Sequence, residues 1–556
     1  MALLMMIYRI IFVIVVLIGS TSADLSWFYP ASPLTGFVAA PGAPWPMPES
    51  WQNSTSQMTL DPLTFQFTSD LTDCDVIDNA IQRYMKYIDL DPNGVIDPGL
   101  TQLTGLTLTV DDTNCAQDYY PHQGMDESYS LTISGSTEGS LSAKTIWGAL
   151  RGLETFSQLL YLKENKMYRI NQTTIIDAPR FPFRGFLIDT SRHFVTVEVI
   201  LNILDLLSWD KFNVLHWHIS DDPSFPYTSR TYPDLTMGAY TPDHVYSRDN
   251  ITKILYEARL RGIRLLPEFD TPGHSWSWGE GYPALLTPCW GEGLEGGPFK
   301  PNYPYHGPSE VINPMEEYSY EFMDNFFQEI AEDFPDGYIH LGLDEVNHNC
   351  WASNPNISSW MEDMGFTELN QVEQYYVERI IEIVARKGSY YIIWEDPINK
   401  GVKVNESAIV VVWMGNWEES MSRITSQGHY VILSSPWYLN YISYGEDWRT
   451  YYAIEPLSFT NNATLWKLVK GGEACMWGEY VDSTNIISRT WPRISTVGER
   501  LWSTIDVKNV DDAQYRLHQH RCRILRRGMP AQPIMNSFCG DYEWDYDRSP
   551  HNTPLS

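Results

Sequence analysis

The sequence predicts an α/β fold, a (β/α)₈ barrel preceded by a small α+β domain. From residue 184 onward, short apolar segments alternate with helical patterns, which is the periodicity of a parallel sheet joined by crossover helices. Eight such segments indicate a closed barrel, and no Gly-rich phosphate loop follows the first one, which argues against a doubly wound open sheet. The predicted strands are 185–189, 214–220, 264–270, 338–344, 390–395, 409–414, 430–435 and 471–477.

The residues before the barrel are predicted to form a separate unit, 24–180. An alternating segment at 128–134, a Gly-bounded turn and a helical pattern at 143–160 are typical of a small α+β domain. The stiff connection from Asp177 to Pro182 cannot be helical, because a residue before proline avoids the α region. The barrel domain is therefore expected at 181–556, with a C-terminal helix near 512–527 and a tail.

Helical patterns lie between most of the barrel strands, at 195–209, 252–261, 318–333 and 372–386. The stretch 271–314, which follows the third strand, is rich in Gly, Pro and Trp. Loops of that length inside a compact domain are usually functional.

Composition excludes a nucleic-acid partner. The chain has 556 residues with a formal charge of −32 at pH 7, so no basic face could dominate its surface. Aromatic residues make up 14% of the chain, including 21 Trp. Trp and Tyr offer flat apolar faces with one polar atom, which is the surface a sugar ring prefers.

The N-terminus is predicted to be an export signal, 1–23. Arg9 precedes an apolar run at 10–18, and small residues at Thr21 and Ala23 suit cleavage after Ala23. The run is shorter than the ~20 residues of a membrane span, and no span is predicted elsewhere. Six N-x-S/T sequons support a secretory route to the lysosome or the outside of the cell; they begin at Asn53, Asn171, Asn250, Asn356, Asn405 and Asn462.

Seven cysteines in an exported chain predict three disulfides and one free thiol. Three pairs are close in the predicted organisation: Cys74 with Cys115, Cys289 with Cys350, and Cys522 with Cys539. Cys475 lies inside an apolar strand and is the expected free thiol, although the spacing also allows other pairings.

The predicted strand ends carry the residues that point to chemistry. In a (β/α)₈ barrel the C-terminal ends of all strands meet at one face, where catalytic groups lie. Charge at the end of a buried strand is costly, and a single such residue could be an ordinary loop residue. Carboxylates or tryptophans at all eight ends are not explained by packing. The ends carry Asp189 and Arg192, Asp221 and Asp222, Glu268, Asp270 and His274, Asp344 and Glu345, Trp394 and Glu395, Trp413, Trp437 and Tyr438, and Trp477 and Glu479.

Acidic residues within a ring of tryptophans are typical of a sugar-cleaving pocket. A metal site is the competing interpretation, because His216 and His218 point to one face of a strand. The apolar strand and the absence of a third His nearby favour a satisfied barrel interior, so neither a metal nor a cofactor is expected. A serine hydrolase is disfavoured, because no G-x-S-x-G elbow occurs.

The chain resembles the animal lysosomal-type β-N-acetylhexosaminidases, which include the α and β subunits of the human enzyme. The resemblance runs from near Asp177 to the tail and rests on RGFLIDTSRH (184–193), KFNVLHWHISDDPSFPY (211–227), RGIRLLPEFDTPGHSWSWG (261–279), HLGLDEV (340–346), SPWYLNYISYG (435–445) and GGEACMWGEYVD (471–482). It implies the same three cysteine pairs. It also implies exo-cleavage of terminal N-acetylglucosamine or N-acetylgalactosamine from glycoconjugates or chito-oligosaccharides, and assembly as a homodimer or with a related subunit.

The resemblance assigns a role to each candidate residue. Glu345 would be the general acid, with a pKa raised by an apolar wall and by Asp344. The substrate's own acetamido oxygen would be the nucleophile, with Asp344 orienting the acetamido N–H and Tyr438 binding its oxygen. Three tryptophans would form the wall, and the other residues would bind hydroxyls or support the acid. The wall would be Trp394, Trp413 and Trp477. Arg192 and Glu479 would bind hydroxyls, and Asp221 and His274 would support the acid.

Two departures from the family pattern stand out. Leu343 replaces the Gly that normally precedes the Asp. Asn440 is kept, but Tyr441 replaces the Arg that follows it in the form acting on sulfated sugars, so poor use of anionic substrates is expected. Two alternative functions remain: a retaining glycosidase with Glu479 as carboxylate nucleophile, and a non-catalytic glycan-binding protein.

Overall fold

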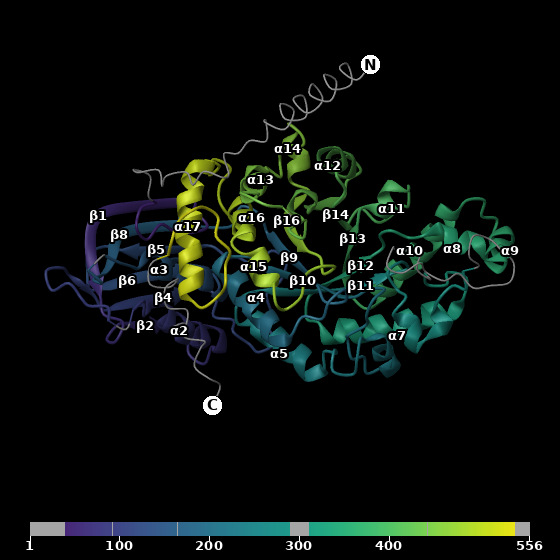
Figure 1. Ribbon diagram of the computed structural model, residues 1–556, viewed down its shortest axis with the longest axis horizontal. Helices are drawn as coiled ribbons and strands as arrows, with labels where there is room; N and C mark the ends of the chain where they lie inside the picture. The colour runs from purple at the N-terminus through teal and green to yellow at the C-terminus, as the bar shows by residue number, and fades with distance from the viewer. Residues whose placement is uncertain (1–38, 92, 164, 290–310, 442, 540–556) are drawn as a thin grey trace, which may run out of the picture.

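The computed structural model describes residues 39–539 apart from 92, 164, 290–310 and 442. The predicted signal peptide at 1–23 lies outside the described residues, and so does the middle of the predicted loop 271–314. Two units lie side by side, an N-terminal sheet and a closed barrel (Figure 1).

The N-terminal unit is a mixed sheet with two helices. Its strands follow the order β2-β4-β6-β5-β8-β1-β3, with β7 paired to β8. Buried and exposed residues alternate along β5 and β6, so one face of the sheet packs against α3. The elements are β1 (Ser50–Leu60), β2 (Gln66–Ser69), α2 (Asp75–Ile88), β3 (Gln102–Leu103), β4 (Gly105–Val110), β5 (Tyr129–Ile133), β6 (Glu138–Ala143), α3 (Ile146–Leu159), β7 (Tyr161–Leu162) and β8 (Tyr168–Asp177).

Eight parallel strands close the barrel in the order β10-β11-β12-β13-β14-β15-β16-β9, so the predicted fold is confirmed. They are β9 (Phe183–Asp189), β10 (Val214–Ser220), β11 (Arg264–Thr271), β12 (Tyr338–Gly342), β13 (Tyr390–Trp394), β14 (Ile409–Val412), β15 (Tyr430–Leu433) and β16 (Val469–Met476). The fourth strand ends two residues earlier than predicted, because Gly342 and Leu343 take positive φ angles of 69° and 71° that leave the extended conformation.

Long helices surround the barrel: α4 (Val197–Trp209), α5 (Arg248–Arg259), α7 (Glu317–Asp333), α10 (Leu369–Arg386), α12 (Trp417–Ser426) and α16 (Arg493–Trp502). Shorter helices are α6 (Trp278–Gly281), α8 (His348–Ser353), α9 (Pro355–Met364), α11 (Asp396–Asn399), α13 (Trp448–Ala453), α14 (Ala463–Trp466) and α15 (Ile486–Thr490). The last helix, α17 (Val510–Arg526), lies beside the N-terminal unit (Figure 1).

Local sequence explains where several helices begin and end. Ser247 and Asn250 form a reciprocal capping box at the start of α5. The Asn509 side chain accepts the first free N–H groups of α17. Helix α9 begins with Pro355 and ends at Gly365 with a φ of 72°, a left-handed conformation that glycine adopts without strain.

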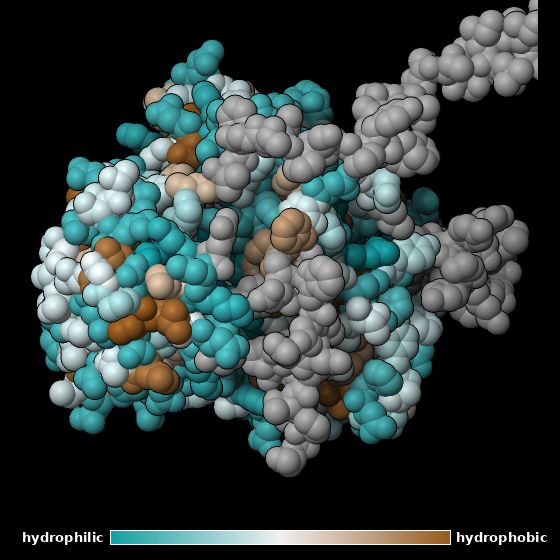
Figure 2. Space-filling model, turned by 60° about the vertical axis from the view of Figure 1, so that its left-hand side comes forward, coloured by the Kyte–Doolittle hydropathy of each residue, from teal (hydrophilic) through white to brown (hydrophobic). Residues whose placement is uncertain are grey.

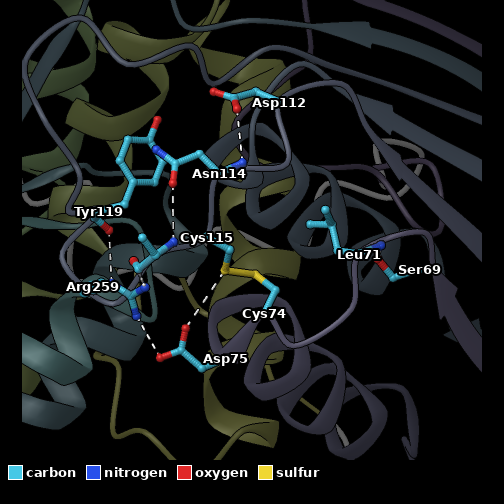
Figure 3. Close-up of a disulfide and its surroundings, with 10 residues drawn as sticks. Ser69, Leu71, Cys74, Asp75, Asp112, Asn114, Cys115, Tyr119 and Arg259 are labelled. Atoms are coloured by element: carbon cyan, nitrogen blue, oxygen red, sulfur yellow. Dashed lines mark hydrogen bonds and ion pairs between the residues drawn. A yellow bond between two sulfur atoms is a disulfide. The ribbon is translucent and has the colours of Figure 1, made fainter.

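The three disulfides join Cys74 to Cys115, Cys289 to Cys350 and Cys522 to Cys539, and Cys475 is free and buried. The first disulfide lies at the boundary of the two units (Figure 3). Next to it, Arg259 of α5 donates to the Asp75 carboxylate at 2.8 Å and to the carbonyl of Tyr119 at 3.0 Å. The barrel is therefore tied to the N-terminal unit by a charged contact beside a covalent link.

The surface is mainly hydrophilic on the face that Figure 2 shows, with isolated hydrophobic patches. Among the described helices, none has the length and the apolar character to cross a membrane. Of the six sequon asparagines, Asn171 and Asn250 are half-buried and the other four are exposed.

Candidate active site

A pocket of about 210 Å³ opens at the C-terminal ends of the barrel strands. All eleven predicted catalytic and substrate-binding residues line it, together with His218, Asp270 and Tyr441, which were not assigned such roles. The predicted residues are Arg192, Asp221, His274, Asp344, Glu345, Trp394, Trp413, Tyr438, Asn440, Trp477 and Glu479. The barrel geometry therefore gathers residues separated by almost 290 positions into one site.

A tight turn after β12 presents the two central carboxylates. Gly342, Leu343 and Glu345 all have positive φ angles, a conformation that costs a non-glycine residue about 1 kcal/mol or more. At Gly342 a Cβ atom would lie 1.7 Å from the Asp270 carboxylate, so only glycine fits there. The Leu343 side chain is fully buried in the apolar core rather than in the pocket, while its N–H donates to Asp270 at 3.1 Å. The turn thus places Asp344 and Glu345 in different directions from adjacent positions.

Asp344 is a buried carboxylate in a crowded acidic setting. Burial and the neighbouring Asp344 raise the pKa of Asp270 well above its usual range, and burial is also the main cause that raises the pKa of Asp344. The counter-charge comes from His274, whose Nε2 lies 3.7 Å from Asp344 Oδ2. No described group donates a hydrogen bond to Asp344 Oδ1. A hydrogen bond from the neighbouring Asp270 side chain lowers the pKa of Asp344 against the effect of burial, so an N–H group of a bound molecule would meet an acidic pair here.

Glu345 is the more exposed of the pair, with its Oε2 atom 3.3 Å from His274 Nε2. This contact lowers the pKa of Glu345, against the opposing effect of burial. The expectation of a raised pKa in the free protein is therefore wrong. The reason is that the sequence did not reveal how close the imidazole lies, and three carboxylates (Asp221, Asp344 and Asp270) raise the pKa of His274 despite its burial.

Asp396, which the sequence interpretation missed, contacts Glu345 from the start of α11, just after the neighbouring strand β13. Its Oδ1 accepts the Glu345 N–H at 3.2 Å, and its Oδ2 accepts the Trp413 indole N–H at 2.7 Å. Burial and Asp344 raise the pKa of Asp396 to about 7. The signal in the sequence was its position directly after Trp394-Glu395, at the end of a predicted strand.

A chain of buried polar contacts continues beneath the pocket. Asp221 contacts His274 at 3.2 Å through Oδ1 and His218 at 2.9 Å through Oδ2. His218 in turn lies 2.6 Å from Glu268, which also accepts the Trp394 indole N–H at 2.8 Å. Glu268 therefore holds both Trp394, which forms a wall of the pocket, and His218, which leads through Asp221 to His274 beside Glu345.

The aromatic side chains form a cage whose rings are held in place. Tyr438 lies 6.3 Å from Trp413 and 6.4 Å from Trp477 between ring centroids, and Trp394 lies 6.0 Å from Trp477. Arg192 closes one side with its guanidinium 5.2 Å from the Trp477 ring, and is fixed by Asp221 at 2.8 Å and Asp189 at 3.1 Å.

Comparison with known proteins decides the family. The model described as "Glycosyl hydrolase family 20, catalytic domain" matches residues 181–505, and "beta-acetyl hexosaminidase like" matches residues 44–159. The chain belongs to glycosyl hydrolase family 20.

Relatives within this family agree over nearly the full length. The chain is 44% identical to beta-hexosaminidase subunit beta of Felis catus over 527 residues, covering 91% of this chain and 95% of the relative. It is 43% identical to beta-hexosaminidase subunit alpha of Bos taurus over 526 residues, covering 92% and 97%. The resemblance inferred from the sequence motifs is thereby confirmed.

Solved structures agree with the fold. The chitobiase of Flavobacterium johnsoniae superposes with a TM-score of 0.74 at 25% identity, covering 91% of this chain and 73% of that chain. The exo beta-N-acetylglucosaminidase of Vibrio harveyi superposes with a TM-score of 0.74 at 23% identity, covering 89% and 79%.

The metal argument from sequence needs one correction in this family 20 barrel. A third histidine does lie near His216, since the rings of His216 and His340 are 4.5 Å apart and both contact Glu268. The sequence could not show this, because His216 is on β10 and His340 is on β12, two strands that β11 separates, and their rings meet only in the closed interior of the barrel. Another possible ligand group is Asp270, His274 and Asp344. In both groups the acidic and imidazole side chains already contact one another.

A second groove, of about 420 Å³, lies between α7 and α10. Two of its carboxylates form ion pairs, Glu317 with Arg379 and Asp324 with Arg386 at 2.8 Å. It lacks the adjacent carboxylates and the tryptophan cage that distinguish the family 20 pocket.

Proposed function

We propose that this protein is an exo-acting β-N-acetylhexosaminidase that removes terminal N-acetylglucosamine or N-acetylgalactosamine from glycoconjugates or chito-oligosaccharides. The observation that carries the proposal is the buried Asp344, with Oδ1 lacking a described donor, directly beside Glu345 and under an aromatic cage. The names of the relatives, beta-hexosaminidase subunits, support the same activity.

In the proposed reaction Glu345 protonates the glycosidic oxygen while the acetamido oxygen of the substrate attacks the anomeric carbon, so that the glycosidic bond breaks and the aglycone leaves as an alcohol. Glu345, now a carboxylate, then takes a proton from a water molecule that attacks the anomeric carbon and opens the oxazolinium ring, which releases the sugar with net retention. Asp344 Oδ1 accepts the acetamido N–H and stabilises the positive charge that develops on the oxazolinium ring. Tyr438 binds the acetamido oxygen, and Trp394, Trp413 and Trp477 exclude water from the ring as it closes.

The sugar hydroxyls are assigned to Arg192 and Glu479, with Asn440 at the side of the pocket and with Asp221 and His274 supporting the acid. Glu345 enters the reaction protonated. His274 lowers the pKa of Glu345 in the free protein. A lower pH is therefore needed to protonate this carboxyl group. A substrate that displaces water from the half-exposed carboxyl raises this pKa again.

Tyr441 at the pocket mouth favours neutral substrates. Its side chain is 68% exposed and its ring lies 6.0 Å from that of Tyr438. It offers a sulfated or carboxylated sugar no positive charge. We therefore assign neutral oligosaccharides as the preferred substrates.

The biological setting is proposed on the same basis. A signal peptide at 1–23, an N-terminal domain at 24–180 and a catalytic domain at 181–556 would suit a glycoprotein of the secretory route, either lysosomal or secreted. Assembly with a second copy or with a related subunit is supported by the names of the relatives, which are subunits alpha and beta.

The decisive experiment is hydrolysis of an aryl N-acetyl-β-glucosaminide by the wild type and by Glu345→Gln. We expect kcat to fall about 10²–10⁴-fold in the variant, and kcat/KM of the wild type to fall as the pH rises through the pKa of Glu345. A wild type without turnover would favour the glycan-binding alternative. Equal rates on a substrate without the acetamido group would favour Glu479 as a carboxylate nucleophile.

A further inference from the structure

A cavity far from the active site lies where α17 meets the end of α3 and β7. We call it the C-terminal groove; it has a volume of about 220 Å³ and is lined by Gly42, Leu90, Gln158, Leu160, Tyr161, Leu162, Gln519, Cys522, Arg523 and Arg526. One wall is a face of α17 with Gln519, Arg523 and Arg526 at helical spacing. The opposite wall is apolar, with Leu160 and the two residues of β7.

Among the residues that the structure describes, none with a carboxylate is paired with the buried guanidinium of Arg523. Its described partners are Gln158 Oε1 at 2.7 Å, Gln519 Oε1 at 3.2 Å, the carbonyl of Ala43 and His520 Nδ1 at 3.4 Å. None of them is a carboxylate, and burial lowers the pKa of His520. Two other arginines of the last helix and its end form ion pairs, Arg516 with Glu499 at 2.6 Å and Arg527 with Glu154 at 3.0 Å. A buried cation without a counter-charge is costly. Binding of an anion at this wall would therefore be favourable. Burial and the nearby Arg527 lower the pKa of Arg523 to about 9, in agreement.

The sequence supplies a matching segment at a suitable position. Directly after Cys539 the chain reads Gly-Asp-Tyr-Glu-Trp-Asp-Tyr-Asp, so that four carboxylates alternate with three aromatic residues from 541 to 547. Alternate side chains of an extended segment point to opposite sides. Such a segment could turn its acids toward α17 and its rings toward the apolar wall.

The disulfide tethers this segment to the groove. Cys539 is bonded to Cys522, which lines the groove, with 5.2 Å between the Cα atoms. Eight extended residues reach about 26 Å, several times the width of a 220 Å³ cavity. A short tether also gives a local concentration on the order of 1 mM.

We propose that the acidic, aromatic segment 541–547 docks in the C-terminal groove, with its carboxylates toward Arg523 and Arg526 and its rings toward Leu160, Tyr161 and Leu162. The docked segment holds α17 against the N-terminal unit. The competing occupant is the segment 24–38, which precedes Gly42 but carries a single carboxylate, Asp24.

Hydrogen–deuterium exchange on the full chain tests the proposal. Relative to the full chain, a chain ending at Cys539 should exchange the amides of 519–526 and 158–162 at least about tenfold faster, while hydrolytic activity confirms that it is folded. A chain ending at Asp547 is the matched control and should keep full protection. The combination Asp541→Asn, Glu543→Gln, Asp545→Asn and Asp547→Asn should behave like the chain ending at Cys539.

A synthetic peptide of residues 540–556 at about 1 mM should restore protection to the shortened chain, and the same peptide with neutral amides should not. The proposal is overturned if the shortened chain exchanges like the full one. It is also overturned if 1 mM inorganic phosphate restores protection equally, or if removal of 24–38 exposes these amides while removal of the tail does not.

Discussion

The two ends of the barrel differ in how far their buried carboxylates are paired with cations. At the N-terminal end, Glu127 forms ion pairs with Arg184 at 2.6 Å and with Arg151 at 2.9 Å. Asp177 forms an ion pair with Lys211 at 2.8 Å. Burial alone would raise the pKa of Glu127, but the two arginines lower it. At the C-terminal end, burial raises the pKa values of Asp270, Asp344 and Asp396. His274 lowers the pKa of Glu345, and Arg192 and His274 lower that of Asp221 against the effect of burial.

This difference separates a structural end from a reactive end. The paired charges at the bottom join the N-terminal domain to the barrel, since Glu127, Arg151 and Asp177 belong to the first and Arg184 and Lys211 to the second. The carboxylates at the rim outnumber the cations among them, which is unfavourable for folding and typical of a catalytic site. Substitutions at the two ends should therefore affect different properties.

The largest effect is expected at the bottom, from Glu127→Gln. The substitution leaves two buried guanidinium groups without their carboxylate, and should lower the free energy of unfolding by about 3–5 kcal/mol, with kcat unchanged. Urea unfolding and an aryl glycoside assay check this. The exposed Glu418→Gln on α12 is the control and should stay within about 0.5 kcal/mol of wild type. A variant of Glu127 with normal stability would contradict the structural assignment.

At the rim, Asp344→Asn should have the reverse effect. Loss of the charge that stabilises the developing cation should lower kcat about 10²–10³-fold. Stability should hold or increase, because the crowding with Asp270 is relieved. Steady-state kinetics and thermal unfolding of one preparation measure both, with Asp363→Asn on α9 as the surface control. Loss of stability comparable to that of Glu127→Gln would remove the distinction between the two ends.

Asp396→Asn sharpens the comparison through pH. An aspartate ordinarily titrates near 3.9, and the folded value is about 7 because of burial and Asp344. A raised folded pKa of an acid gives stability that is present below about pH 4 and lost as the pH rises toward 7. The wild type should therefore lose about 3 kcal/mol relative to the variant between pH 4 and 7. Unfolding free energies at both pH values check this, and a constant difference would contradict it.

The smallest effect is expected at the mouth of the pocket, from Tyr441→Arg. A guanidinium can pair with a sulfate, so the ratio of kcat/KM for a 6-sulfated over an unsulfated glucosaminide should rise about tenfold, or ~1.4 kcal/mol. Tyr444→Arg, outside the pocket lining, should leave the ratio unchanged. Efficient hydrolysis of the sulfated substrate by the wild type would contradict the proposed preference for neutral sugars.

The positions of the candidate residues were predictable because strand ends of a parallel barrel converge on one face. The pKa shifts of these residues and their charged contacts were not predictable from the sequence. Asp396 follows a predicted strand, yet its bonds to Glu345 and Trp413 depend on the turn after β12. Leu343 is a departure from the family pattern in sequence, and only the structure shows that its side chain packs in the apolar core while its backbone keeps the left-handed conformation.

The sequence alone determined the barrel, its order of strands and the family, because apolar periodicity and the motifs at strand ends are local properties of the chain. The tertiary structure decided which charges are paired. Glu127 and Asp344 are both buried carboxylates. Glu127 forms ion pairs with two arginines, whereas Asp344 lies beside a second aspartate, Asp270. Since Coulomb interactions depend on distances between residues far apart in sequence, only the folded barrel could assign stability to one and reactivity to the other.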